Sequence, residues 1–307
     1  MRWRMCAVLT VWLPAAGGLA LAAAAEPPLP GRAPYLGQKP PGMTAEVFAP
    51  GLVSSSSFEH SRLEISKDGT TLYWAVQPLR GRQSIWTTHR GADGSWSMPA
   101  ELPLSNGAEA LPFLSSPTLA PDGKRLYFTS LDRSTNRQTL YAVDLANPRW
   151  DAATPVPAWF PDIGEVWVFS FAANGNLFFD SGGKLFTMEL RNGGYGAPVK
   201  LGSGINDGEF GALPFIAPDE SYLLFCSARG GSASLDLYVS FRGSDGGWGP
   251  PRDLGPKVNT SANERFPSAS PDGRYLFFLR NGLERGSDSS FYWIDAVVIE
   301  EARPPAQ

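Results

Sequence analysis

A short motif returns five times along this chain, at intervals of about fifty residues. Each copy is a tight polar turn followed at once by a run of leucine and aromatic residues. The five copies are Lys67–Trp74, Pro121–Phe128, Ala173–Phe179, Pro218–Phe225 and Pro271–Phe278. From leucine to leucine the steps are 54, 51, 46 and 53 residues. Repeats of this length are typical of β-propellers and solenoids, in which each copy builds one structural unit.

Each unit has the pattern of four β-strands, and no long stretch has helical periodicity. In four of the five copies the turn carries Gly, which suits a tight hairpin with positive φ at a central position. The following run is apolar on both faces, as expected for a strand inside a packed stack. A third strand follows, and then an aromatic residue with Pro shortly after it, which suits an outer edge strand.

The fifth unit has no such outer strand, because the chain ends soon after Tyr292–Asp295. Glu46–Leu52, near the other end of the chain, matches the missing strand. We therefore predict an all-β fold, a five-bladed β-propeller of four-stranded antiparallel blades that is closed by the N-terminal strand. The alternative is six blades, which would require a degenerate repeat that the sequence does not reveal.

The turn and its Leu-aromatic run resemble the PD40 repeat, a WD40-like unit of the TolB propeller and of many exported bacterial propellers. Pro121–Lys124 and Pro271–Arg274 match it best, and the resemblance covers residues 45–299. It implies a propeller fold and an exported setting. TolB also has an α/β domain before its propeller, which has no counterpart here, so the resemblance does not carry over TolB's particular partners.

The N-terminal 25 residues have the pattern of a signal peptide, because Arg2 and Arg4 precede an apolar run that ends in Ala22–Ala25. Residues 26–44 are rich in Pro and Gly and are interpreted as an extended tether. Residues 45–299 form the predicted propeller, and residues 300–307 a disordered tail. We expect a periplasmic or secreted monomer with no integral membrane segment after the signal is removed.

Charge and composition exclude several classes of function. Removal of Arg2 and Arg4 leaves 24 basic against 30 acidic residues, so the chain has no basic surface for nucleic acid. Cys226 is then the only cysteine and is predicted to be a buried apolar residue. Only two His occur, and the sequence contains neither a nucleophile elbow nor a zinc motif. We assign no catalytic residue and no cofactor, and leave open whether a metal binds.

A Glu precedes the innermost strand of every unit: Glu59, Glu109, Glu165, Glu209 and Glu264. In a propeller these strands line the axis, so the five carboxylates are predicted near one mouth of the channel. Such a set is able to hold a cation, gather a basic peptide or supply two catalytic acids, and we include the adjacent His60 and Arg265 in it. The alternative is that each Glu bonds backbone N–H groups between blades.

The longest irregular segment, residues 147–165, and the strand after it contain Trp159, Phe160 and Trp167. These aromatics are a candidate platform for a sugar or a partner side chain, and the alternative is packing over the third repeat. From these features we expect a non-catalytic propeller of the cell envelope that binds a protein or a glycan. The alternative is a carbohydrate-active enzyme, a glycoside hydrolase or lyase, that uses two of the Glu residues.

Overall fold

The fold is described from a computed structural model. It describes residues 29–55, 58–78, 80–107, 109–146, 148–156, 166–202, 204–208, 210–228, 234–282 and 289–305. The predicted signal peptide, Trp159, Phe160, Glu165 and Glu209 lie outside these residues.

Three of the sheets are antiparallel and have four strands each. The first consists of β7 (Leu114–Leu119), β8 (Arg125–Asp132), β9 (Arg137–Asp144) and β10 (Thr154–Pro155). The second consists of β11 (Val166–Phe171), β12 (Leu177–Ser181), β13 (Lys184–Met188) and β16 (Val199–Lys200), beside a hairpin of β14 (Leu190–Arg191) and β15 (Gly194–Tyr195). The third consists of β17 (Phe210–Ile216), β18 (Tyr222–Ala228), β19 (Asp236–Phe241) and β20 (Arg252–Asp253).

A larger sheet of nine strands joins the two ends of the chain. Its last group consists of β21 (Asn263–Ala269), β22 (Tyr275–Asn281), β23 (Ser289–Asp295) and β1 (Glu46–Val47). Its first group consists of β2 (Phe58–Glu59), β3 (Glu64–Ile65), β4 (Thr71–Gln77), β5 (Ser84–His89) and β6 (Ala100–Glu101). The two groups meet where β2 runs parallel to β23, with Phe58 opposite Ser289.

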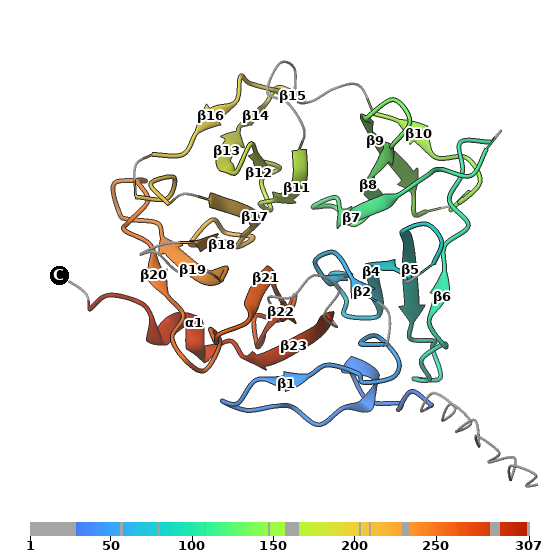
Figure 1. Cartoon of the computed structure of the whole chain (residues 1–307), viewed down its shortest axis with the longest axis horizontal. Coiled ribbons are helices and arrows are strands. Elements are labelled where there is room, and N and C mark those ends of the chain that lie inside the picture. The colour runs from blue at the N-terminus through green and yellow to red at the C-terminus, as the bar shows by residue number, and fades with distance from the viewer. Residues whose placement is uncertain are drawn as a thin grey trace, which may run out of the picture.

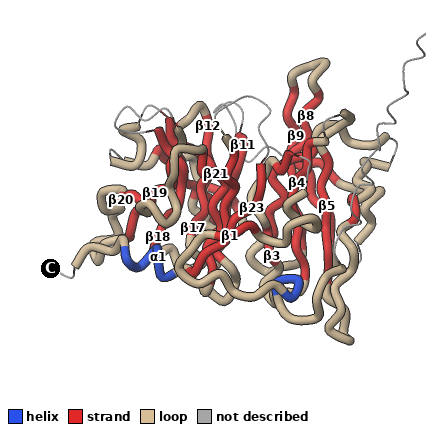
Figure 2. The backbone as a smooth tube through the Cα atoms, turned by 60° about the horizontal axis from the view of Figure 1, so that its bottom comes forward, coloured by secondary structure: helices blue, strands red, loops and turns tan. Residues whose placement is uncertain are grey.

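The sheets stand around a common centre, with the first strand of each group innermost and the short last strands at the rim (Figure 1). Figure 2 shows the strands side by side, with the β8–β9 hairpin extending beyond the others. The described helices are short, η1 (Tyr35–Gly37) and α1 (Val297–Glu301). The prediction of an all-β chain built from four-stranded antiparallel sheets is therefore confirmed in its essentials.

The N-terminal strand takes the outer place in the last group, where the sequence predicted an outer strand. Glu46 lies opposite Trp293 and Val47 opposite Tyr292 in the antiparallel pair of β1 and β23. Phe48 follows directly and is fully buried, with its ring centroid 5.1 Å from that of Phe277 and 5.2 Å from that of Trp293. The two ends of the chain are thus joined by backbone pairing and by an aromatic cluster.

The Pro-rich segment contacts the rest of the molecule from Arg32 onward. The ring of Tyr35 lies 5.1 Å from that of Tyr275 and 5.6 Å from that of Trp293, both in the last group. In the first group, Arg90 Nε donates to the carbonyl of Arg32 at 3.0 Å, and Trp96 Nε1 donates to the next carbonyl, that of Ala33. The segment therefore spans the seam between the first and last groups.

Four innermost strands carry a bulge at corresponding positions of the repeat. The pairing register shifts between Ser115 and Thr118 in β7, and likewise within β11, β17 and β21. Ser116, Leu213 and Phe266 at these bulges have φ of 53°, 59° and 53°. A bulge turns the chain locally and redirects its polar groups. Here the bulges stand around the centre of the ring.

Replacing Phe48 by Ala is expected to destabilise the fold by about 3–5 kcal/mol, since a fully buried ring is lost where the two chain ends join. Urea unfolding followed by tryptophan fluorescence measures this change. Met98→Ala is the control, because Met98 is 43% exposed and its loss is expected to cost less than about 0.5 kcal/mol. Equal losses in the two variants would contradict the role given to Phe48.

Candidate functional site

One buried side chain, Arg62, bonds to strands of three different sheets and is only 4% exposed. Its Nη1 donates to the carbonyl of Pro214 at 3.2 Å. Its Nη2 donates to the carbonyl of Phe169 at 3.1 Å and to Thr118 Oγ1 at 3.3 Å. These acceptors belong to the innermost strands of three different sheets. One guanidinium in the first group therefore holds β7, β11 and β17 together.

Glu64 is the counter-charge of Arg62. Arg62 Nε lies 3.2 Å from Glu64 Oε2, and Glu64 Oε1 accepts a hydrogen bond from the backbone N–H of Leu119 at 2.9 Å. Burial raises the pKa of Glu64, and the positive charge of Arg62 opposes that rise. The carbonyl of Leu63, between these two residues, accepts a hydrogen bond from Ser268 Oγ at 3.0 Å. Ser268 lies on β21, so this bond ties the last group to the same place. The Arg62–Glu64 pair and the adjacent Leu63 carbonyl thus connect the nine-stranded sheet with the three four-stranded sheets.

On one side of this pair lies a cavity of about 330 Å³, which we call the funnel. Its floor includes Arg62 and Glu64. Above them stands a ring of residues from corresponding positions of the five repeats: Ile65, Leu119, Phe171, Ile216 and Ala269. Pro121, Pro218 and Pro271 lie nearer the turns. The funnel is therefore an apolar recess with a polar floor.

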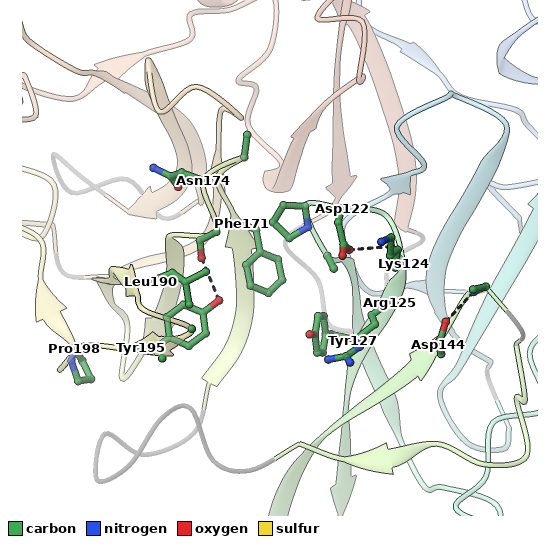
Figure 3. A pocket seen from close by; sticks show the side chains of 18 of the residues that line it. Asp122, Lys124, Arg125, Tyr127, Asp144, Phe171, Asn174, Leu190, Tyr195 and Pro198 are labelled. Carbon is green, nitrogen blue, oxygen red and sulfur yellow. Dashed lines mark hydrogen bonds between the residues drawn. The ribbon is translucent and has the colours of Figure 1, made fainter.

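A second cavity of about 1170 Å³, the lateral cleft, opens beside the funnel on the same face. One wall comes from the β7–β8 turn, β8 and the end of β9. The other comes from the end of β11, the turn after it, the β14–β15 hairpin and the loop before β16 (Figure 3). The two cavities share Ala120, Pro121, Phe171 and Ala173. Residues of the repeat turns therefore line both cavities.

Aromatic side chains from two sheets line the cleft (Figure 3). The ring of Phe171 lies 5.7 Å from that of Tyr127. Tyr195 is fixed by a hydrogen bond from its hydroxyl to the carbonyl of Gly175 at 3.1 Å, and burial raises its pKa to about 12. Phe171 and Tyr195 are partly buried, and Leu190 beside them is 38% exposed. The cleft therefore presents fixed apolar faces to solvent.

Four charged residues also line the cleft: Asp122, Lys124, Arg125 and Asp144. Both carboxylates are used in turns, since Asp122 Oδ1 accepts from the backbone N–H of Lys124 at 3.0 Å and Asp144 Oδ1 from that of Ala146 at 2.8 Å. Arg125 is exposed, and its hydrogen bond with Tyr127 raises its pKa. No ion pair to Arg125 occurs within the described residues. The two positive and two negative side chains of the cleft therefore cancel in net charge.

Two of the Glu residues predicted at the channel mouth are fully buried. Glu59 Oε1 accepts hydrogen bonds at 2.9 Å from both the backbone N–H and the hydroxyl of Ser55. Glu264 Oε1 accepts from Arg280 Nε at 2.7 Å and from Thr260 Oγ1 at 2.8 Å. These bonds hold the chain just before each innermost strand.

The third Glu of the set that can be placed, Glu109, is exposed, and its backbone N–H donates to Asn106 Oδ1. Glu165 and Glu209 lie outside the described residues. The three that are described therefore do not share one environment, and a common binding role for the set stays a prediction.

His60 and Arg265 lie close together at the ring of Phe266. The ring centroids of His60 and Phe266 are 5.8 Å apart, and the Cζ of Arg265 lies 5.6 Å from the same ring. Burial, together with the charge of Arg265, lowers the pKa of His60 to about 4, so His60 is neutral at neutral pH. Burial also lowers the pKa of Arg265.

The predicted aromatic platform can be placed in part. Trp167 lies on β11 and is 48% exposed, and its carbonyl accepts a hydrogen bond from Ser116 Oγ at 2.5 Å. Trp159 and Phe160 lie outside the described residues. The aromatic residues of the lateral cleft are different ones. Tyr127 belongs to a run that the sequence predicted to be a packed strand, and no sequence pattern marked Phe171 or Tyr195 as part of a site.

Asp180 on β12 is a buried acid that the sequence analysis did not single out. Its Oδ1 accepts from the backbone N–H of Val168 at 2.7 Å, and its Oδ2 accepts more weakly from that of Leu213 at 3.4 Å in the next sheet. Burial raises the pKa of Asp180 to about 7, against the opposing effect of these bonds. Asp180 therefore links β11 and β17, as Arg62 does, but it accepts hydrogen bonds from these strands where Arg62 donates them.

The described residues contain no group of three or more His, Cys, Asp or Glu side chains that could hold a metal ion. Within the same residues, no helix has both the length and the apolar character needed to cross a bilayer.

No protein-family model and no curated protein matches this chain. Solved structures do resemble it. A TolB from Agrobacterium tumefaciens is 15% identical with a TM-score of 0.51, over 78% of this chain and 77% of that one. A thermostable family-43 glycoside hydrolase is 11% identical with a TM-score of 0.50, over 78% and 89%. TolB from Acinetobacter baumannii is 18% identical with a TM-score of 0.48, over 79% and 55%.

These likenesses show the fold alone. The chain has the β-propeller fold, and the resemblance to TolB that the repeat motif predicted is confirmed at the level of structure. Because a hydrolase shares the same fold, the likeness does not decide between binding and catalysis.

Replacing Arg62 by Met is expected to cost about 3–5 kcal/mol, because the Glu64 carboxylate is left buried without its partner. The double variant Arg62→Met/Glu64→Gln is expected to lose less than the single variant, because it removes the uncompensated charge. Chemical denaturation at neutral pH measures both. The control is Arg149→Met, since Arg149 and Asp151 form an exposed pair worth less than about 1 kcal/mol. A double variant less stable than the single would refute the charge argument.

Asp180 predicts a pH dependence of stability. Its pKa is near 3.8 when unfolded and about 7 when folded, so the folded state binds the proton more tightly. Its contribution is fully present below pH 3.8 and is lost as pH rises through 7. The shift of about three pKa units, at about 1.4 kcal/mol for each unit, corresponds to a change on the order of 4 kcal/mol in the free energy of unfolding. Asp180→Asn removes this term, so the stability of the variant relative to wild type is expected to increase from pH 4 to pH 8. A difference independent of pH would contradict it.

Proposed function

We propose that this protein is an exported, non-catalytic β-propeller that binds a protein or a glycan in the cell envelope. Its five blades are the three four-stranded sheets and the two groups of the nine-stranded sheet, with β1 as the outer strand of the last blade. It acts as a monomer in the periplasm or outside the cell. Binding takes place on the face that carries the funnel and the lateral cleft.

The observation that carries this proposal is the pair of adjacent cavities, which have Phe171 among their shared lining residues. Binding sites are concave and combine apolar surface with a few fixed polar groups. The cleft offers fixed aromatic rings and an exposed Arg125 side by side. Its volume of about 1170 Å³ is at or above the usual range for small-molecule pockets, which favours a segment of a larger ligand.

The chemistry of the described carboxylates supports binding over catalysis. Glycoside hydrolysis needs one carboxyl kept protonated and one ionised, placed on either side of the bond to be broken. Asp122 and Asp144 in the cleft accept hydrogen bonds from turn N–H groups, and Glu59 and Glu264 are buried with their partners. The alternative is a carbohydrate-active enzyme that uses two of the predicted Glu residues. The similarity of the fold to that of a family-43 glycoside hydrolase favours this alternative.

Export is supported by the leader-like residues 1–25 and by the fold shared with TolB. The acidic excess of the chain supports a ligand other than nucleic acid. No metal or cofactor is part of the proposal.

Immobilised protein is expected to retain a protein or a polysaccharide from an envelope extract and to release no sugar from a polysaccharide panel. Phe171→Ala is expected to lose the retained ligand, because Phe171 lines both cavities. Mass spectrometry of the eluate and a reducing-sugar assay are the measurements. Val199→Ala, at an exposed position of the outer strand β16, is the control for folding and non-specific capture. Cleavage of a polysaccharide that Glu209→Gln abolishes would establish the enzyme alternative instead.

A further inference from the structure

The shape of the lateral cleft fits an elongated ligand. Its volume is about 1170 Å³, and small residues line the side formed by the β14–β15 hairpin and the loop after it. A Cβ placed on Gly193 would meet no atom within 4 Å, and one on Gly194 would meet only a carbonyl oxygen at 4.0 Å. The hairpin therefore leaves open space in front of its backbone, where a chain can pass.

The aromatic faces of the cleft are held in place before any ligand arrives. The Phe171 ring packs at 81° against Phe169, with 5.8 Å between centroids, and at 48° against Tyr127. Tyr195 is held by its bond to the Gly175 carbonyl. The C–H groups on one face of a sugar ring are apolar and pack well on such rings, while the hydroxyls around its edge need polar partners. Fixed rings lower the entropy lost on binding.

The polar groups of the cleft match hydroxyl groups better than they match a charged ligand. Lys124 and Arg125 are balanced by Asp122 and Asp144, so the lining carries no net charge. A guanidinium has five N–H donors in a fixed plane, and carboxylates are acceptors, so the lining provides both hydrogen-bonding roles. The electrostatic potential of this lining therefore complements neither a polyanion nor a strongly basic peptide.

We propose that the lateral cleft binds a neutral oligosaccharide, with sugar rings against Phe171 and Tyr195 and hydroxyl groups bonded to Arg125 and the neighbouring turn residues. The inference rests on the proposed binding function and narrows its ligand to one class. The funnel beside the cleft is not required for it.

The test is isothermal titration calorimetry of the full mature chain with neutral gluco-, manno-, galacto- and xylo-oligosaccharides, and with uronic-acid and sulfated oligosaccharides for comparison. Tyr195→Ala removes one aromatic face, and Tyr195→Phe keeps the ring while removing the hydroxyl. Arg125→Ala removes the exposed donor. Arg252→Ala is the matched control, since Arg252 is an exposed arginine on the outer strand β20 of another sheet. Thermal melts establish that each variant is folded.

The expected result is binding of at least one neutral oligosaccharide, weakened about tenfold or more by Tyr195→Ala and by Arg125→Ala. Arg252→Ala is expected to stay within about threefold of wild type, and Tyr195→Phe is expected to bind with an affinity between those of wild type and Tyr195→Ala, because it keeps the ring but loses the bond to the Gly175 carbonyl. The inference is overturned if no neutral oligosaccharide binds, if only acidic ones bind, or if folded cleft variants bind as wild type does. Capture of an envelope protein that depends on Phe171 but is unchanged by Tyr195→Ala would overturn it while leaving the proposed function intact.

Discussion

The buried charge of Arg62 is the constraint on which the arrangement of the sheets depends. A guanidinium removed from water is costly unless each of its donors finds an acceptor, and the acceptors here come from separate sheets. The positions of β7, β11 and β17 are therefore coupled through a single group. Glu64 supplies the opposite charge and a bond to β7. The walls of the funnel and the inner wall of the lateral cleft are parts of these same strands.

The joining of the chain ends is the second condition for the ring. Pairing of β1 with β23 covers what would otherwise be an open edge, and Phe48 fills the space against Phe277 and Trp293. The segment around Tyr35 then crosses the seam. Backbone pairing, aromatic packing and this crossing segment all act at the seam between the first and last groups.

The repeated motif predicted the sheets and the place of the N-terminal strand because both follow from local patterns: alternation, turn residues and a period of about fifty. The same reasoning could not find Arg62 or Asp180. The bulge position that holds Arg62 in the first group corresponds to Ser116, Leu213 and Phe266 elsewhere, so no periodic signal marks it. The lateral cleft was missed for a related reason, since Tyr127 and Tyr195 meet only when two sheets are placed side by side.

The bonds of Arg62 also affect what the funnel can offer a ligand. The guanidinium lines the funnel, and it already donates to the carbonyls of Pro214 and Phe169 and to the hydroxyl of Thr118. A ligand in the funnel is therefore expected to be held mainly by apolar contact with the side chains around it.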